Sequence, residues 1–335
     1  MTTLVDIARE ASVSLTTAAS ILRGDTKRFS QATIDSINAT ARRLGYIPNL
    51  FSRNLKKGRY GTILLLLDRV VPSGLLNRQV LSGFIDAAAA RDYKIIPEQC
   101  DEADAVERTD LAFKKSLYYD GMIISFNNLS PDRAEAFERS VNRFQVPVLW
   151  YNLKLSHNAV YVDESGAAEK LGAGIAALGL RRWLYIGLAP DTDHYSAADR
   201  YEGIRAFAAA HPEIRLDQIL LTKQEIMSAD LSGWEETMRV KAAACAQFDA
   251  VIFSNPLYAP TWLHQLRDGE RPRLFTVDSL PVGKGQLRLP GTENGWTEVR
   301  RQSVEWLLSR MANLKTGLRE KSRVMNASVN LISRS

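Results

Sequence analysis

The sequence predicts a small all-α head that contains a helix-turn-helix, followed by an α/β body of two doubly wound parallel-sheet lobes. Two observations carry this prediction. Hydrophobic residues recur at helical spacing through the first 46 residues, and short apolar runs alternate with helical stretches from residue 61 onward. At 335 residues the chain is long enough for two or more domains.

Three short helices are expected in the head. Apolar residues at positions 4, 7, 8 and 11 follow Thr3 and Asp6, which are spaced as a capping box. Ser14 is placed to cap a second helix from about Leu15 to Leu22. The three-residue turn between these two helices has helix-turn-helix spacing. Ser30 is placed to cap a third helix that ends at Gly45.

The second helix lacks charged side chains and carries small hydroxyls on its polar face. Short side chains allow a helix to enter the major groove of DNA, where Ser and Thr can bind phosphates or base edges. An ordinary amphipathic helix rich in Ala and Thr is the alternative. The adjoining turn and the charge of the segment favour the DNA reading.

Positive charge is concentrated in the same segment. Residues 1–60 contain ten Lys and Arg against four Asp and Glu, whereas the rest of the chain contains 33 basic and 34 acidic residues. This distribution is typical of a nucleic-acid-binding head on a neutral body. A basic solvated tail is the alternative that charge alone leaves open.

The segment after the third helix, residues 47–60, has a second pattern. Ile47-Pro48 stops the helix, and the residues from Asn49 to Leu55 can form one or two helical turns that are too short to be stable alone. A short basic helix with exposed apolar residues could fold on a DNA minor groove and insert a wedge between base pairs. A plain interdomain linker is the alternative.

The stretches VDIAREASVSLTTAASIL and RRLGYIPNLFSRNLKKGRYGTI, within residues 3–62, resemble the head and hinge of the LacI/GalR (lactose-repressor) family of bacterial transcription regulators. The resemblance implies a repressor that binds a near-palindromic double-stranded DNA operator as a homodimer. It places Leu15, Thr16 and Ser20 at base edges. It also places four hydroxyl-bearing residues at phosphates: Ser14, Thr17, Ser30 and Thr33. In the hinge it implies DNA contacts by Asn49, Arg53 and Leu55, with Leu55 as the minor-groove wedge.

Two positions of the second helix depart from the family pattern. Ala19 stands where the family usually has Ser, and Ser20 stands where it usually has Arg. The first change removes a phosphate bond and the second removes a strong base reader, so we expect an operator unlike the common family sites. We expect Arg23, where Asn is usual, to compensate in part.

From Gly61 onward, nine short apolar runs are expected to be buried strands of parallel sheets. They are ILLLL (63–67), YKII (93–96), GMIIS (121–125), VPVLWY (146–151), AVYV (159–162), RWLYIGL (182–188), ILLT (219–222), AVIFS (250–254) and RLFTV (273–277). This number of strands is more than one compact sheet accommodates, and two lobes are therefore expected. Ligands are expected to bind between the two lobes, at the carboxyl ends of the strands.

No pattern in the sequence argues for an enzyme, a cofactor or a metal site. Gly172 and Gly174 begin a G-x-G-x-x-A string, but the string lies in a helical stretch and is better explained by close packing of that helix on the sheet. The four histidines occur singly, without a zinc motif, and are interpreted as surface or loop residues.

The body resembles the family's effector domain, which has a periplasmic-binding-protein-like fold. The stretch HYSAADRYEGIRAF places Arg200 as the side chain that grips the effector and Ser196 as a second contact. The resemblance adds Asn152, Asn255 and Asp278 as effector-binding residues. For Arg200 and Asp278, a lobe–lobe ion pair and a helix cap are the structural alternatives.

Several family marks are missing from the body. Residues 73–76 read SGLL and residues 289–294 read LPGTEN, and Pro256 replaces an acid that usually follows Asn255. These departures concern the identity of the effector rather than the fold. The resemblance implies a carbohydrate or carbohydrate derivative as effector, but not whether it acts as inducer or corepressor.

The expected domains are a helix-turn-helix DNA-binding domain (1–46), a hinge (47–60) and an effector-binding and dimerisation domain (61–335). Lobe 1 is expected at about 61–160 and 291–320, and lobe 2 at about 161–290 and 321–335. The start of the chain lacks signal-peptide features, and ILLLL is far shorter than a membrane span. We therefore expect a cytoplasmic protein without a membrane partner. A solute-binding protein without DNA readout is the alternative from another class.

Overall fold

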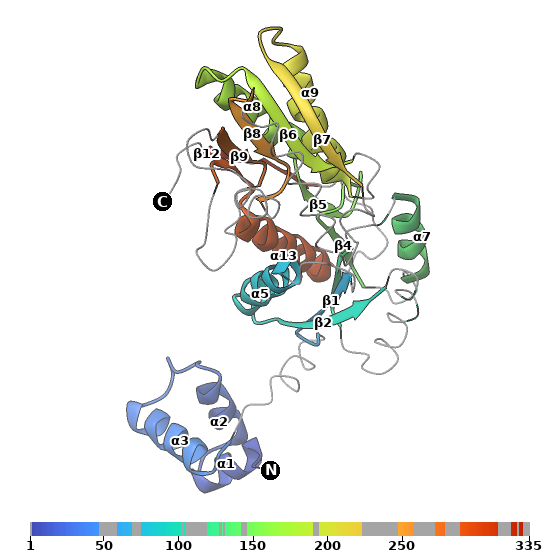
Figure 1. The fold of residues 1–335 in the computed structure, drawn as a ribbon. Helices are drawn as coiled ribbons and strands as arrows, with labels where there is room; N and C mark the ends of the chain where they lie inside the picture. Colours follow the sequence, from blue (N-terminus) through green and yellow to red (C-terminus); the bar gives the residue numbers. More distant parts are fainter. Residues whose placement is uncertain are drawn as a thin grey trace, which may run out of the picture. The chain divides into compact units, whose positions relative to one another are not determined.

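The fold is taken from a computed structural model of the chain (Figure 1). The structure describes residues 2–46, 59–68, 75–101, 104, 107, 119–126, 129, 131–141, 146–189, 194–222, 247–256, 272–278, 289–313, 323–326 and 328–330. The chain divides into two compact units, a head (Met1–Gly61) and a body (Thr62–Ser335).

The head contains the three expected helices, α1 (Leu4–Glu10), α2 (Leu15–Leu22) and α3 (Gln31–Arg43). The predicted start signals are confirmed. The capping box of α1 has both reciprocal bonds, and the Ser14 and Ser30 side chains accept backbone N–H bonds at the starts of α2 and α3. After α3 the chain turns at Gly45, whose φ of 61° is a backbone conformation that favours glycine.

The three helices of the head share one small core. The buried residues come from all three helices: Ile7, Ala8, Ala18, Ile21, Ile37 and Ala41. Ala18 and Ile21 of α2 are almost fully buried in this core. Because the apolar side of α2 is used in this core, its opposite side is left for other contacts.

The first sheet of the body has the strand order β11-β5-β4-β3-β1-β2, and all its pairs are parallel. Its strands are β1 (Thr62–Asp68), β2 (Lys94–Cys100), β3 (Gly121–Ser125), β4 (Val148–Tyr151), β5 (Ala159–Val162) and β11 (Arg323–Met325). Side chains of α5 (Leu75–Ala89) and α13 (Trp296–Asn313) cover one face, and α7 (Pro131–Val141) covers the other. Successive side chains of β1 point to opposite faces of the sheet, so Ile63 and Leu65 are buried in one core and Leu64 and Leu66 in the other.

The second sheet has the order β12-β10-β9-β8-β6-β7, and only its β10–β12 pair is antiparallel among the described pairs. Its strands are β6 (Arg182–Leu188), β7 (Arg215–Leu221), β8 (Ala250–Phe253), β9 (Arg273–Thr276), β10 (Gly291–Glu293) and β12 (Ser328–Asn330). Helices α8 (Glu164–Ala177) and α9 (Tyr195–Ala209) pack on one of its faces. The prediction of two parallel-sheet lobes is confirmed.

The strand pairing differs from the predicted lobe bounds at three places. All of β5, through Val162, belongs to the first sheet, as does β11, whereas β10 belongs to the second sheet. The expected bounds assigned Tyr161, Val162 and β11 to lobe 2, and β10 to lobe 1. The two misassigned strands are three residues long and lack an apolar run, so only their pairing partners reveal their lobe.

The glycine-containing string of α8 has a different neighbour from the one expected. Gly172 lies inside the helix, as expected, but a Cβ added there would come within 2.9 Å of the Phe207 ring on α9. At Gly203 of α9, a Cβ would approach the Ser165 carbonyl to 2.5 Å. The missing side chains at Gly172 and Gly203 therefore allow α8 and α9 to approach each other closely, while Leu171 and Ile175 of α8 pack on the sheet.

Candidate functional site

The N-terminal end of α2 presents the residues that the sequence assigned to DNA. Ser14 Oγ accepts the Thr17 N–H at 3.0 Å and lies 2.8 Å from Thr17 Oγ1. Leu15 is 48% exposed, although it is apolar, and Thr16 is exposed beside it. The helix end therefore offers hydroxyls, an apolar side chain and backbone N–H groups, and it has no acidic residue in its first turn.

Ser20 is placed differently from the prediction. Its side chain is 7% exposed, so it does not face solvent as a base-reading residue would. Arg23 covers it, since the Arg23 guanidinium donates to the Ala19 carbonyl at 2.9 Å and to Ser20 Oγ at 3.4 Å. In this arrangement Arg23, rather than Ser20, presents a polar group to solvent at the C-terminal end of α2.

The remaining assigned residues of the head belong to α3 and the hinge. Ser30 Oγ accepts the Thr33 N–H at 3.3 Å, so both hydroxyls lie at the exposed start of α3. Asn49, Arg53 and Leu55 lie outside the described residues.

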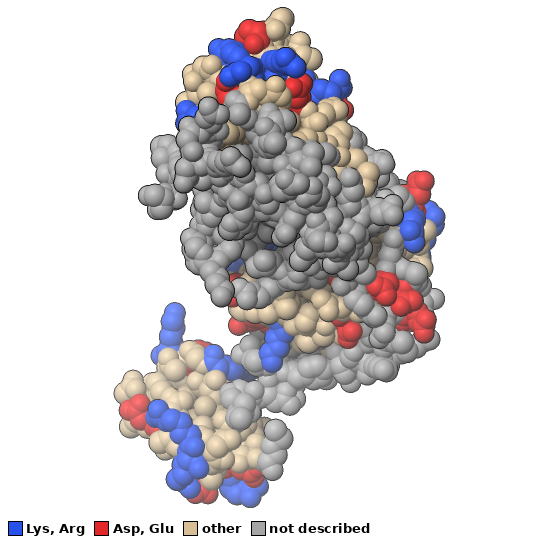
Figure 2. Space-filling view, viewed as in Figure 1, with Lys and Arg blue, Asp and Glu red and all other residues tan. Residues whose placement is uncertain are grey.

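Ion pairs occupy three of the four acidic residues of the head. Arginines lie 3.6 Å from Asp6, 3.4 Å from Asp25 and 2.8 Å from Glu10. In Figure 2 several Lys and Arg side chains lie on the visible face of the head, among uncharged residues. Because basic residues outnumber acidic residues in this segment, a surplus of positive charge is available for an anionic partner.

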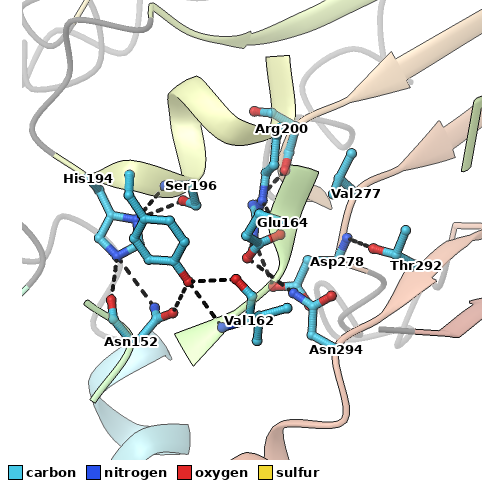
Figure 3. A network of polar contacts seen from close by, with 12 residues as sticks. Asn152, Val162, Glu164, His194, Ser196, Arg200, Val277, Asp278, Thr292 and Asn294 are labelled. Carbon is cyan, nitrogen blue, oxygen red and sulfur yellow. Dashed lines mark hydrogen bonds and ion pairs between the residues drawn. The ribbon is translucent and has the colours of Figure 1, made fainter. Parts of the chain in front are cut away.

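A buried polar cluster lies at the carboxyl ends of the second sheet's strands (Figure 3). Arg200 of α9 is 7% exposed, and its Nε and Nη2 donate to the two carboxylate oxygens of Glu164 at 2.8 and 2.6 Å. Its Nη1 donates to the Ser254 carbonyl, just after β8, at 2.7 Å. Burial alone lowers the pKa of Arg200, but the adjacent carboxylates more than offset this and raise it.

Asp278, which follows β9, is the second carboxylate of the cluster. Its Oδ2 lies 3.7 Å from Arg200 Nη2, and its Oδ1 accepts the Trp296 indole N–H at 2.9 Å. Burial raises the pKa of Asp278 to about 7, with Glu164 adding to the rise, whereas Arg200 and Trp296 lower it. Because Trp296 begins α13 of the first lobe, the Asp278–Trp296 bond joins the two lobes.

His194 and Tyr195 form a second junction between the lobes. His194 caps α9, and its Nε2–H donates to the Asn152 carbonyl after β4 at 3.0 Å, while its Nδ1 accepts the Ser196 N–H at 3.3 Å. Burial, together with the Arg200 charge, lowers the pKa of His194 to about 4, so the ring is neutral at neutral pH. The Tyr195 hydroxyl donates to Asn152 Oδ1 at 3.0 Å and accepts the Val162 N–H at 3.3 Å.

We expect Tyr195→Phe to destabilise the body by about 1–3 kcal/mol, because it leaves the Asn152 side chain and the Val162 N–H without their partner. Urea unfolding measures this effect. Tyr201→Phe is the matched control, since Tyr201 lies on the same helix but its hydroxyl bond to Gln218 is exposed. Equal stability of the two variants would contradict the interlobe role of Tyr195.

The predicted effector residues divide between these two groups. Arg200 and Asp278 lie together in the cluster, whereas Asn152 and Ser196 lie at the His194 junction. Asn255 follows Ser254 at the end of β8 and is partly buried. Arg200 does form an ion pair, but not the lobe–lobe pair that was the alternative, because its bidentate partner Glu164 belongs to the same lobe.

Sequence reasoning missed four residues of the site: Glu164, His194, Asn294 and Trp296. His194 was interpreted as a surface or loop residue, whereas the structure places it as a half-buried helix cap. Glu164 lies two residues after the end of β5, which is a signal that could have drawn attention to it. Among the described residues no cluster of His, Cys, Asp or Glu could hold a metal ion. No described helix is long and apolar enough to span a bilayer.

Comparisons with known proteins agree with this architecture. The family described as "Bacterial regulatory proteins, lacI family" matches residues 3–49. Catabolite control protein A of Staphylococcus xylosus is 24% identical over 270 residues, which cover 79% of this chain and 77% of that protein. The body and head together resemble a lac repressor dimer bound to operator and the anti-inducer ONPF, with a TM-score of 0.70, 17% identity and coverage of 98% and 97%. A transcriptional regulator CelR–cellobiose complex is similar with a TM-score of 0.62, 17% identity and full coverage of both chains.

A helix-turn-helix head and a two-lobed parallel-sheet body together define a DNA-binding transcription regulator with an effector-binding domain. Residues 3–49 match the lacI family of bacterial regulatory proteins, and the chain as a whole is similar to regulators of the LacI/GalR family. The named relatives are regulators rather than enzymes.

Proposed function

We propose that the chain is a repressor that binds a near-palindromic operator as a homodimer in the bacterial cytoplasm. In this proposal residues 1–46 read the DNA, residues 47–60 form the hinge, and residues 61–335 dimerise and bind the effector. The observation that carries it is the exposed start of α2, with Ser14, Leu15, Thr16 and Thr17, on a three-helix head that has an excess of basic residues.

The same proposal gives the body a regulatory role. A small molecule, a carbohydrate or a derivative of one, binds between the lobes near Asn152, Ser196, Arg200, Asn255 and Asp278. Support comes from polar groups of both lobes that already meet there, and from the sugar bound by a structurally similar regulator. A ligand at these contacts changes the relation of the lobes and thereby operator affinity, which is a coupling between two sites.

Selection from random DNA duplexes tests the DNA-binding role. We expect the purified protein to enrich a near-palindrome, with an affinity that falls linearly in log salt as counterions are released from contacted phosphates. Leu15→Ala is expected to lower affinity for the selected site about tenfold. Val5→Ala is the matched control, because Val5 is also apolar and 51% exposed but lies on α1.

Three outcomes of the selection are informative. Equal loss from both alanine variants would contradict base reading by α2. Salt-sensitive binding without a preferred sequence, with or without sugars, would instead favour a solute-binding protein whose head is a basic anchor. A site recovered only in the presence of a sugar would identify that sugar as a corepressor.

A further inference from the structure

The charges of the Arg200 cluster do not balance within the described residues. Glu164 already neutralises Arg200 through two hydrogen bonds of 2.8 and 2.6 Å. Asp278 adds a second carboxylate, 4% exposed, whose Oδ2 has only a longer contact with Arg200 at 3.7 Å. His194, the next titratable group, is neutral because burial lowers its pKa to about 4. With both carboxylates ionised, the cluster therefore has one excess negative charge.

The cluster also has an excess of hydrogen-bond acceptors. Asn294 is 3% exposed, and its Nδ2 donates to Glu164 Oε1 at 3.3 Å. This bond directs the amide nitrogen to the carboxylate, and Asn294 Oδ1 then has no hydrogen-bond partner among the described residues. A buried acceptor without a partner costs free energy, so the site calls for a donor from outside the described protein groups.

We propose that the effector bound between the lobes carries a protonated amine, which pairs with Asp278 and donates to Asn294 Oδ1. An ammonium group supplies the missing positive charge and up to three N–H donors. The inference rests on the proposed small-molecule site and specifies the chemical class of its ligand.

The surroundings of Asp278 fit an organic cation better than an anion. The Trp296 indole donates to Asp278, and the Tyr151 ring lies 6.2 Å from the Trp296 ring. Aromatic rings beside a carboxylate favour a desolvated ammonium group. A ligand carboxylate or phosphate would instead meet two buried carboxylates, while the one arginine of the cluster is already paired.

The pH dependence of binding follows from the groups around Asp278. These groups are Glu164 on α8, Arg200 on α9, and Tyr151 and Trp296 from the first lobe, with Arg300 acting on Tyr151. Since the pKa of Asp278 is about 7, protonation below that pH removes the excess negative charge. Amine affinity should therefore fall when the pH is lowered from 7 to 5, a range in which the amine stays protonated.

Calorimetry on the full chain, with matched sugars, tests the ligand class. The probes are D-glucosamine, D-galactosamine and D-mannosamine. Each is compared with its neutral hexose and with its hexonate. Potassium chloride at equal ionic strength controls for binding of a simple cation. We expect at least one amine to bind at millimolar concentration or better, about tenfold more tightly than its hexose, and the hexonates not to bind. No amine binding, or tighter binding of a hexose or hexonate, would overturn the proposal.

Two variants locate the amine and one serves as control. Asp278→Asn and Asn294→Leu should each lower amine affinity about tenfold or more without improving hexose binding. Asp249→Asn is the control, because Asp249 lies in the same lobe but pairs with exposed Arg182. Amine binding that survives Asp278→Asn would contradict an amine at this site. Potassium chloride that binds to the unchanged protein as tightly as the amine would contradict it too.

Operator affinity separates this inference from the proposed function. An amine that binds through Asp278 without changing operator affinity supports the ligand class and contradicts the regulatory role. A neutral or acidic sugar that binds and changes operator affinity supports the regulatory role and overturns the amine.

Discussion

Glu164→Ala is expected to destabilise the body by about 3–5 kcal/mol, because it leaves the Arg200 charge buried without its bidentate partner. Both side chains are almost fully buried, at 7% exposure for Arg200 and 0% for Glu164, so solvent cannot replace the lost carboxylate. Urea unfolding of the full chain, followed by a probe of the body such as tryptophan fluorescence, measures the change.

A control variant and a rescue variant test whether the stability loss in Glu164→Ala comes from the ion pair. Glu169→Ala removes an exposed glutamate from the same helix and should change stability little. Glu164→Leu combined with Arg200→Met replaces the pair by apolar side chains and should be more stable than Glu164→Ala. A loss with Glu164→Ala no larger than that with Glu169→Ala would show that the ion pair contributes nothing.

Asp278→Asn is expected to stabilise the body at pH 8, by about 4 kcal/mol, and to have little effect below pH 4. Burial raises the pKa of the folded carboxyl to about 7, whereas its ordinary value is 3.8. The folded state therefore holds a proton that the unfolded state has lost, so stability from this group is present below pH 4 and is lost as the pH rises to 7. Thermal or urea unfolding of both proteins from pH 4 to pH 8 gives the difference curve.

Asp249 provides a contrast of opposite sign. The Arg182 side chain, followed by the backbone N–H groups of Arg181 and Arg182, lowers the pKa of Asp249 to about 2. Its stabilisation is present above pH 3.8 and is lost as the pH falls through 2. Asp249→Asn should therefore destabilise the body at pH 8, where Asp278→Asn stabilises it. A pH-independent difference for Asp278→Asn would mean that this carboxyl is ionised in the folded protein throughout the range.

Local patterns predicted the head and the longer strands. The Thr3–Asp6 box and the Ser14 and Ser30 caps act over three residues, so their sequence spacing is enough to place the helix starts. The nine apolar runs each overlap a strand, because a strand buried on both faces needs apolar residues without interruption, although the edge strands β2 and β7 are only partly buried. The three-residue strands β10 and β11 lack such runs, and their lobes were assigned wrongly.

The prediction for Ser20 shows where a family pattern stops being informative. The pattern places position 20 on the reading side of α2, but it contains no information about the neighbour that this chain has at position 23. Arg23 is long enough to fold back over the helix end, and it covers the Ser20 hydroxyl. The residue at one position of a pattern therefore changes the exposure of another.

By itself the sequence determined the three-helix head, the excess charge of that head, the alternation of strands and helices, and the family. Only the tertiary structure decided the chemistry of the interlobe site. Arg200, Glu164, Asp278 and Asn294 are separated by 36 to 130 residues where they bond, and no spacing rule links them. Their contacts follow from the order of the second sheet, which places β8, β9 and β10 side by side, and from the packing of α8 and α9 on that sheet. Burial at that meeting point sets their charges, and burial is a property of the packed molecule rather than of any segment.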